Sequence, residues 1–379
     1  MRRLIALVSV IVFVDAMLFG AIIPLVPGYA DEYDLGKLEA GLLVGAFGAG
    51  ALAGGIPGGL LARRIGPRNV VVLGLILLAA ASFAFAVAAS PLALGLARFA
   101  QGVASVATWT GALAWVTVRA PRERRGQVIG TVFSFAVLGF IVGPMFGAVA
   151  ELAGIRTTFA IVGVVGLSLA AAVAIAPSSA PEEPAQGAVR RAFNDPAFVV
   201  GLWLNALPAF LFGMLDVLGP LSLDDGGYGT VAVAAVFVAA GLVETAVNPL
   251  VGRLSDRRGR LVPIRASLAG SIAVGVALAL AESPHWIAVL VIAAALAFGG
   301  FYTPGMALVA DRVDRAGLGQ GLGFGLINSA WALGALAGPA LGGALADLLG
   351  DAAPYLLGAA LSATTLAAIA SQTTRVRTA

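Results

Sequence analysis

The chain has 379 residues, of which 60% are hydrophobic and 11% are charged, and its mean hydropathy is +0.98. A soluble domain of this size cannot hide so much apolar surface, because the fraction of surface that a fold buries grows slowly with chain length. The absence of cysteine excludes disulfides and thiolate metal sites, and the net charge of +3 is explained by loop arginines without invoking nucleic acid.

Apolar runs of about 20 residues follow one another along the whole chain, and each can cross ~30 Å of hydrocarbon as a helix. Helices satisfy their own backbone groups, and no β-barrel alternation is present. We therefore predict an all-α integral membrane protein with twelve transmembrane helices. The expected spans are 4–28, 39–62, 69–89, 91–117, 127–150, 155–176, 197–220, 229–251, 262–281, 285–309, 320–346 and 352–370. The first imitates a signal peptide, but its length favours a retained helix.

A polar, Pro-rich stretch separates the sixth span from the seventh. It divides the chain into a six-helix bundle over 1–176, a linker over 177–196 and a second six-helix bundle over 197–379. Arginines gather in the loops of one side, whereas the other side carries mainly acids, such as DEYD at 31–34. This asymmetry predicts that the linker and both termini are cytoplasmic and that the chain is a multi-pass protein of the inner (plasma) membrane.

A glycine pattern occurs twice, as GTVFSFAVLGFIVGPMFG at 130–147 and GLINSAWALGALAGPALG at 325–342. Glycines four residues apart let a neighbouring helix approach closely, and the proline removes a backbone hydrogen bond and favours a bend. We expect packing roles for Gly139, Gly143, Pro144 and Gly147, and for Gly334, Gly338, Pro339 and Gly342. Gly130 lies about half a turn away from this stripe at 100° per residue, so the same face does not explain it.

A charged loop also recurs, as GLLARRIGPR at 59–68 and GRLSDRRGRL at 252–261. Glycine permits close helix approach, and Asp256 can accept hydrogen bonds from helix N-termini or arginines. The loop is either a latch that closes one end of a carrier or a simple arginine anchor, and we favour the latch. Arg63 removes the acid from the first copy, so any gate is asymmetric. The expected members are Gly59, Arg64 and Gly66 in the first copy, and Gly252, Asp256, Arg257, Gly259 and Arg260 in the second.

Four charges fall within the expected spans, namely Asp15, Arg98, Asp216 and Glu244. A charge in the bilayer core costs ~2.5–3.5 kcal/mol on insertion scales, so each is a functional hypothesis. Three carboxylates against one arginine favour a cationic or protonatable substrate. One carboxylate can bind either a proton or an organic cation, which is the simplest basis for exchange. The alternatives are an Asp15–Arg98 structural pair, a cytoplasmic crevice for Glu244 and the outer interface for Asp216.

Three aromatic residues lie deep in the expected spans. Trp109 and Trp331 either hold a cation against their ring faces or pack against neighbouring helices. Tyr302 precedes Thr303 and Pro304 and is a candidate cavity hydroxyl. The single histidine, His285, is best explained as an interfacial residue.

With these elements in view, the sequence resembles the major facilitator superfamily and, within it, the twelve-helix drug:proton antiporters. The closest likeness is to the vesicular monoamine transporters and their bacterial relatives. The loop at 252–261, LARFAQG at 96–102 and both glycine stretches look like motifs of that group, and 14–27 and 194–220 look like its first and seventh helices. Arg63 and Pro67 depart from the loop motif.

The resemblance also implies roles for single residues. Asp15 matches an aspartate that contacts the amine, and Asp216 aligns with a glutamate of the seventh helix. Two further acids of that group are replaced here by Gly299 and Asn328, and Asn328 is expected to line the binding site in place of the acid. Glu244 has no counterpart, so the proton route cannot be transferred from the group.

We therefore predict a monomeric, proton-coupled exporter of lipophilic cations or amines that works by alternating access and draws on the proton gradient without a cofactor or metal. Proton-coupled uptake of a small metabolite is the nearest alternative. A lipid-handling enzyme would need a nucleophile–base pair or metal cluster, and a sensor would need a signalling domain, and the sequence offers little material for either. Because no GxxxxGK[ST] occurs, direct ATP drive is also disfavoured.

Overall fold

The structure, a computed structural model, describes residues 1–120, 124–178, 187–318 and 320–378. The side chains at 63, 125, 126, 256, 303, 307, 311, 314, 320, 321 and 372–378 lie outside this description. The described residues form helices and no strand, in agreement with the predicted all-α class. The helices of the first half are α1 (Arg2–Gly20), η1 (Ile23–Leu25), α2 (Val26–Tyr33), α3 (Lys37–Ile65), α4 (Pro67–Val87), α5 (Pro91–Arg119), α6 (Arg125–Ala153) and α7 (Ile155–Ala174). They are followed by α8 (Ala188–Phe193), α9 (Pro196–Asp225), α10 (Thr230–Arg258), α11 (Leu261–Ala279), α12 (Pro284–Gly299), α13 (Tyr302–Ala316), α14 (Gln320–Leu349) and α15 (Ala352–Thr378).

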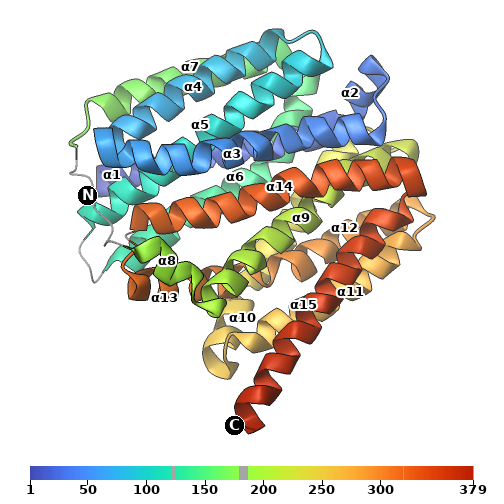
Figure 1. Cartoon of the computed structure of the whole chain (residues 1–379). Coiled ribbons are helices and arrows are strands. Elements are labelled where there is room, and N and C mark those ends of the chain that lie inside the picture. Colours follow the sequence, from blue (N-terminus) through green and yellow to red (C-terminus); the bar gives the residue numbers. More distant parts are fainter. Residues whose placement is uncertain (121–123, 179–186, 319, 379) are drawn as a thin grey trace.

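Eleven stretches of the described chain are long and apolar enough to cross a membrane. The twelfth expected span is α5, which has 29 residues but is less apolar than the others. Its interior carries Arg98, Gln101 and several hydroxyl side chains, and these polar groups are buried. Helix α5 therefore runs through the interior of the bundle, between α3 and α4 (Figure 1).

Two expected spans are broken in the middle. The first divides into α1, η1 and α2, and Pro24 explains the break because it lacks the N–H that would continue the helical ladder. The tenth divides into α12 and α13 around Gly300 and Phe301, just before Pro304. Helices α6 and α14 instead continue through Pro144 and Pro339.

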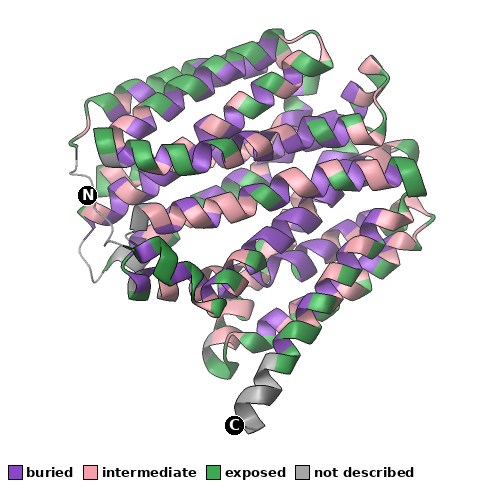
Figure 2. Cartoon of the chain, viewed as in Figure 1, coloured by how far each residue is buried: buried purple, intermediate pink, exposed green. Residues whose placement is uncertain are grey.

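Each half has its own apolar core. One buried cluster is built almost wholly from α1 to α7, and a second is built from α9 to α15. In Figure 2 buried positions concentrate where the helices face one another, and exposed positions lie along the outer faces of helices such as α4 and α7. This outer apolar surface suits contact with lipid. The boundary residues 176 and 197 stay a prediction.

Sharp turns at glycine recur in both halves at matching places. Gly66 joins α3 to α4 with φ 85° and ψ 153°, and Gly259 follows α10 with φ 85° and ψ 156°. Gly154 and Gly350, with φ 98° and 88°, follow α6 and α14. Only glycine adopts these positive φ values without strain. The internal repeat that the sequence indicates therefore extends to backbone geometry.

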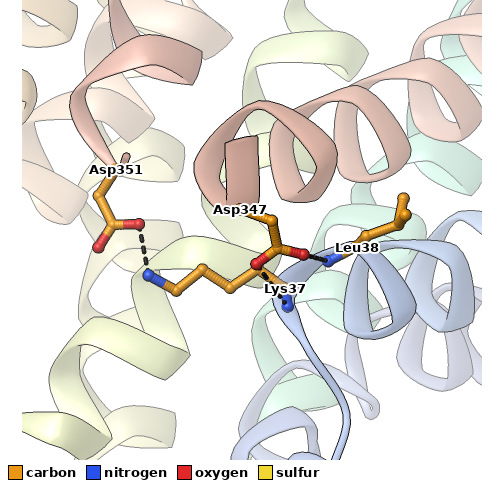
Figure 3. A network of polar contacts seen from close by, with 4 residues as sticks. All are labelled: Lys37, Leu38, Asp347 and Asp351. Atoms are coloured by element: carbon orange, nitrogen blue, oxygen red, sulfur yellow. Dashed lines mark hydrogen bonds and ion pairs between the residues drawn. The ribbon is translucent and has the colours of Figure 1, made fainter. Parts of the chain in front are cut away.

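The bundle has two ends. The Lys37 end carries the α2–α3 and α14–α15 connections, and the Gly66 end carries the α3–α4 connection. At the Lys37 end, Asp347 of α14 accepts hydrogen bonds from the backbone N–H groups of Lys37 (3.2 Å) and Leu38 (2.8 Å). The Lys37 ammonium also pairs with Asp351 (Figure 3). These contacts join the two halves.

Candidate substrate cavity

A cavity of about 370 Å³ lies between the two halves and is lined by residues of both. Helices α1, α3, α5 and α6 contribute one side, and α9, α10 and α12 to α14 contribute the other. Seven of the eight residues expected to bind substrate or protons line it. They are Asp15, Trp109, Asp216, Glu244, Tyr302, Asn328 and Trp331.

Asp15 is held on the first-half wall by two donors from α5. The Ser105 hydroxyl and the Trp109 indole N–H both donate to Asp15 Oδ2 at 2.6 Å. Asp15 Oδ1 is buried and accepts no hydrogen bond from the described residues. The carboxylate is therefore oriented through one oxygen, and the other keeps its hydrogen-bonding capacity unused at the cavity wall.

Arg98 lies outside the cavity lining, and no hydrogen bond or ion pair joins it to Asp15 among the described residues. Its guanidinium donates to the carbonyl oxygens of Leu18 (3.1 Å) and Phe19 (3.4 Å), at the end of α1, and to Gln101 Oε1 (3.1 Å). It also lies 4.9 Å from the ring centre of Phe47. Arg98 thus supports the C-terminal end of α1, because the last carbonyl groups of a helix have no intrahelical donors. An Asp15–Arg98 ion pair is not formed in this structure.

The second-half wall carries two carboxylates, one on α9 and one on α10. Asp216 is buried at 7% exposure, and Glu244 is half-buried. Asn248 lies one helical turn beyond Glu244 and within hydrogen-bonding reach of it. Tyr302, at the start of α13, lies near the carboxylates of Asp216 and Glu244. Its hydroxyl is within hydrogen-bonding reach of Trp331.

The lining is acidic and aromatic. Among its described residues it contains three carboxylates and no lysine, arginine or histidine. The ring of Trp331 lies 5.2 Å from that of Phe19, and the ring of Trp109 lies 5.6 Å from that of Phe133. Asn328 Nδ2 is buried without a hydrogen-bond acceptor. Such a cavity can enclose an apolar molecule that carries positive charge.

Several polar lining residues were not singled out from the sequence, namely Ser105, Asn205, Thr245 and Asn248. Two of them follow a pattern that the sequence does contain. Ser105 lies four residues before Trp109, and Asn248 lies four residues after Glu244, so each shares a helix face with a recognised site residue. Asn205 has no such signal, and its amide donates to its own helix at Gly201 O (2.7 Å).

The repeated glycines lie against helix backbones, one set in each half. A Cβ atom on Gly143 would lie 2.9 Å from the Cα of Gly20, and one on Gly338 would lie 2.9 Å from the Cα of Phe210. Gly139 likewise faces α1, Gly147 faces Ala21 and Pro24 just beyond it, and Gly334 and Gly342 face α9. Gly130 has no atom within 4 Å of a Cβ built on it, so it is not part of this packing.

The model of the Major Facilitator Superfamily matches residues 8–324 of the chain, which is well over half of it. The chain belongs to the major facilitator superfamily. The family is one of membrane transporters, and the fold described above agrees with this assignment.

Curated relatives in the superfamily include the quinolone resistance protein NorA of Staphylococcus aureus, 24% identical over 371 residues and 95% of each chain. The MFS-type transporter ppzB of Metarhizium rileyi is 30% identical over 156 residues, which are 39% of this chain and 32% of that protein.

Solved structures with the superfamily fold include a bacterial homologue of the human lysosomal transporter Spinster in an inward-facing, unoccupied conformation (TM-score 0.73, 17% identity, 97% of this chain and 94% of that one). Nucleoside transporter NupG superposes with a TM-score of 0.77 at 15% identity and covers 97% of this chain and 99% of its own. At these identities the likeness concerns the fold alone.

The superfamily's charged loops form the two glycine turns at the Gly66 end. Gly59 and Gly252 have no atom within 4 Å of a Cβ built on them, so the expectation of close helix approach at these glycines is wrong in this structure. Gly66 and Gly259 act instead through their positive φ. Arg64 and Arg257 are exposed, and the latch around Arg260 stays a prediction because the Asp256 side chain lies outside the described residues.

Proposed function

We propose that the protein is a proton-coupled antiporter that exports lipophilic organic cations or amines by alternating access. The observation that carries the proposal is the cavity between the halves, which has three carboxylates, several aromatic rings and no basic residue among its described lining. An anionic substrate would meet only repulsion from ionised carboxylates there. A cation would find both charge pairing and ring faces.

Exchange follows from the chemistry of a carboxylate. Asp15 lines the cavity, and its Oδ1 has no hydrogen-bond partner among the described residues, so the carboxylate can take up either a proton or a charged N–H of the substrate but not both at once. A proton arriving from the side of higher proton concentration displaces the cation, and loss of that proton on the other side restores the site. No cofactor or metal takes part in this scheme, and the drive is the proton gradient.

Membrane placement completes the proposal. The arginine-rich loops include those at the Gly66 end, which the positive-inside rule assigns to the cytoplasm together with both termini. The chain would then be a monomeric, multi-pass protein of the inner (plasma) membrane. The full-length match to a protein named for quinolone resistance supports export, and the finer likeness to monoamine carriers stays a prediction.

Proteoliposomes with an acidic interior test the proposal. We expect accumulation of ethidium or a similar lipophilic cation only while the pH gradient lasts, and release when a protonophore removes it. Asp15→Asn keeps the size of the side chain but loses its charge. Because a hydrogen bond to a charged group contributes ~1.5–3 kcal/mol, the variant should lose roughly 10- to 100-fold in gradient-driven transport.

The matched control is Asp225→Asn, since Asp225 is an exposed carboxylate at the end of α9 that does not line the cavity. It should transport as the wild type does. Cation transport that is indifferent to the pH gradient would refute antiport. Full coupled transport by Asp15→Asn would refute the assigned role of Asp15 while leaving antiport intact. Gradient-driven transport of an uncharged metabolite in the same direction as protons would favour uptake by symport.

A further inference from the structure

The Glu244 side chain fills a space that exists because residue 299 is glycine. A Cβ atom on Gly299 would lie 2.6 Å from Glu244 Cδ and 3.0 Å from Glu244 Cγ, and it would overlap Oε1 as well. A Cβ atom essentially never lies within 3.0 Å of a non-bonded heavy atom in a folded protein. Any side chain at 299 would therefore have to displace the carboxylate. We refer to this space, bounded by Gly299 and occupied by the Glu244 carboxylate, as the Gly299 notch.

The Gly299 notch lies at the break of the tenth span. Helix α12 ends at Gly299, α13 begins at Tyr302, and Glu244 reaches the gap between them from α10. Tyr302, Glu244 and Asp216 all line the cavity, whereas Gly299 does not. The glycine thus lies behind the carboxylate, and the cavity lies in front of it.

Around the Gly299 notch, the Glu244 carboxylate has no partner of opposite charge among the described residues. Tyr302 lies near both Glu244 and Asp216, and Asn248 is the neighbouring polar group on α10. No described ion pair involves Glu244, and no described lysine, arginine or histidine lines the cavity. A buried structural charge normally has a partner of opposite sign. Glu244 is half-buried, lines the cavity and has no partner of opposite charge among the described residues, so it can bind a cation that enters the cavity.

We infer that Gly299 is a positioning residue. Because it has no side chain, the Glu244 carboxylate can extend from α10 to the break between α12 and α13 and bind the cation there. The inference rests on the proposed function and adds the position of the second-half cation contact to it. Because α10, α12 and α13 belong to one half, this carboxylate travels with Asp216 and Tyr302. Asp15, Ser105 and Trp109 form the facing group on the other half. A bound cation then lies between two sets of residues, one on each half, and the two sets move relative to each other when the halves move.

Moving the carboxylate from one helix to the other tests the inference. In Glu244→Ala combined with Gly299→Asp, the new side chain projects from Gly299 into the volume that Glu244 has left. In Glu244→Ala combined with Gly299→Asn, a side chain of the same size enters the same volume without the charge. The readout is gradient-driven cation transport in proteoliposomes, together with the KM for the cation.

We expect Glu244→Ala alone to lose about 10-fold or more in transport, as for the loss of a charge-assisted contact. The Asp-bearing double variant should recover to within about threefold of the wild type, and the Asn-bearing one should remain near Glu244→Ala. Equal activity of the Asp and Asn double variants would overturn the inference, because then the carboxylate's position at the break would not matter.

A second pair of variants keeps the test decisive if a double variant does not fold. Gly299→Ala adds one methyl group where Glu244 lies. Gly270→Ala adds one on α11, where its Cβ would lie 3.4 Å from the Cβ of Ala297, an ordinary contact. We expect Gly299→Ala to raise the KM for the cation about fivefold or more and Gly270→Ala to leave it within about twofold. An unchanged KM in Gly299→Ala would overturn the inference.

The two proposals fail in different ways. If the wild-type protein transports no cation under a pH gradient, the proposed function fails. If the wild type transports cations but neither the carboxylate transfer nor Gly299→Ala behaves as expected, the antiport proposal stands and the role of Gly299 is wrong.

Discussion

Two of the helix pairs that join the halves differ although the internal repeat relates them. Helix α3 lies along α14 for much of its length (Figure 1), whereas its counterpart α10 packs against α6. On α3, a Cβ atom on Gly48 would lie 2.6 Å from the carbonyl carbon of Ala335, and one on Gly41 would lie 3.0 Å from the carbonyl carbon of Pro339. The α3–α14 contact is therefore made by backbone against backbone.

The α6–α10 pair meets through side chains. A Cβ atom on Gly241 of α10 would lie 2.9 Å from the side-chain atom Cγ1 of Ile141 but 3.7 Å from the Cα of that residue. Beyond Gly241 toward the Gly66 end, the residues Glu244, Thr245 and Asn248 face the cavity. The next glycine of α10, Gly252, meets no atom within 4 Å.

This difference indicates unequal roles in alternating access. Backbone surfaces in close contact cannot part at one point without losing many contacts at once, because dispersion contacts are individually weak and collectively strong. A side-chain contact such as that of Ile141 with Gly241 can adjust by a rotamer change. We expect the halves to turn about the middle of the α3–α14 seam, where Gly48 meets Ala335, and the α6–α10 seam to separate more readily.

The largest expected effect tests the rigid seam. Gly48→Val places a branched side chain against the backbone of Ala335 and Leu336, which cannot move aside locally. Overpacking of a core costs ~1–3 kcal/mol, and contact with backbone lies at or beyond the upper end. The thermal unfolding temperature of the purified protein in detergent should fall markedly, or folded protein should be lost.

Gly241→Val is the matched change in the other seam and should have a smaller effect. Ile141 can rotate away, so the expected loss of stability is about 1 kcal/mol or less. The same unfolding measurement applies. Equal destabilisation by Gly48→Val and Gly241→Val would contradict the difference between the seams.

A smaller effect is expected at the Lys37 end, where Asp347 caps the N-terminus of α3 from the opposite half. Loss of an N-cap costs typically ~1 kcal/mol, and 1.4 kcal/mol is a tenfold change in an equilibrium. Asp347→Ala should shift the population toward separation of the halves at this end by about fivefold. Spin labels at Arg156→Cys and Asp225→Cys, two exposed positions at the Lys37 end in an otherwise cysteine-free chain, would measure it by pulsed EPR.

The smallest effect is expected for Asp351→Asn. Its ion pair with Lys37 is half-exposed, with side chains 51% and 31% exposed, and such pairs contribute ~0.2–1 kcal/mol. The EPR distance distribution should change less than in Asp347→Ala and should approach the wild type at high salt. An Asp351→Asn effect larger than that of Asp347→Ala would show that the ammonium–carboxylate pair, and not the helix cap, closes this end.

Much of the architecture follows from local features of the sequence. Apolar runs separated by arginine, glycine and proline place the helices, and the spacing of Gly139, Gly143 and Gly147 indicates the packing face that α1 occupies. The break at Gly300 is harder to predict. A Gly-Gly pair followed by Pro304 is compatible with either a kinked continuous helix or two helices, and packing against α10 decides between them.

Partners from distant parts of the chain are likewise not encoded in local patterns. Nothing near residue 15 indicates that Ser105 and Trp109 hold its carboxylate, or that Arg98 binds carbonyl groups of α1 in place of Asp15. The meaning of Gly299 depends on Glu244, 55 residues earlier, because the glycine matters only where another helix fills its space.

Helix α5 has a consequence for how the protein reaches the membrane. It carries the buried Arg98 about two turns from its start, and a charged side chain within a membrane span is costly unless it is paired. The groups that satisfy Arg98 are carbonyl oxygens of α1, which is synthesised about 80 residues earlier. We therefore expect α5 to become stable in the membrane only once it packs beside α1. The N-terminal helices assemble in an order that their polar contacts impose.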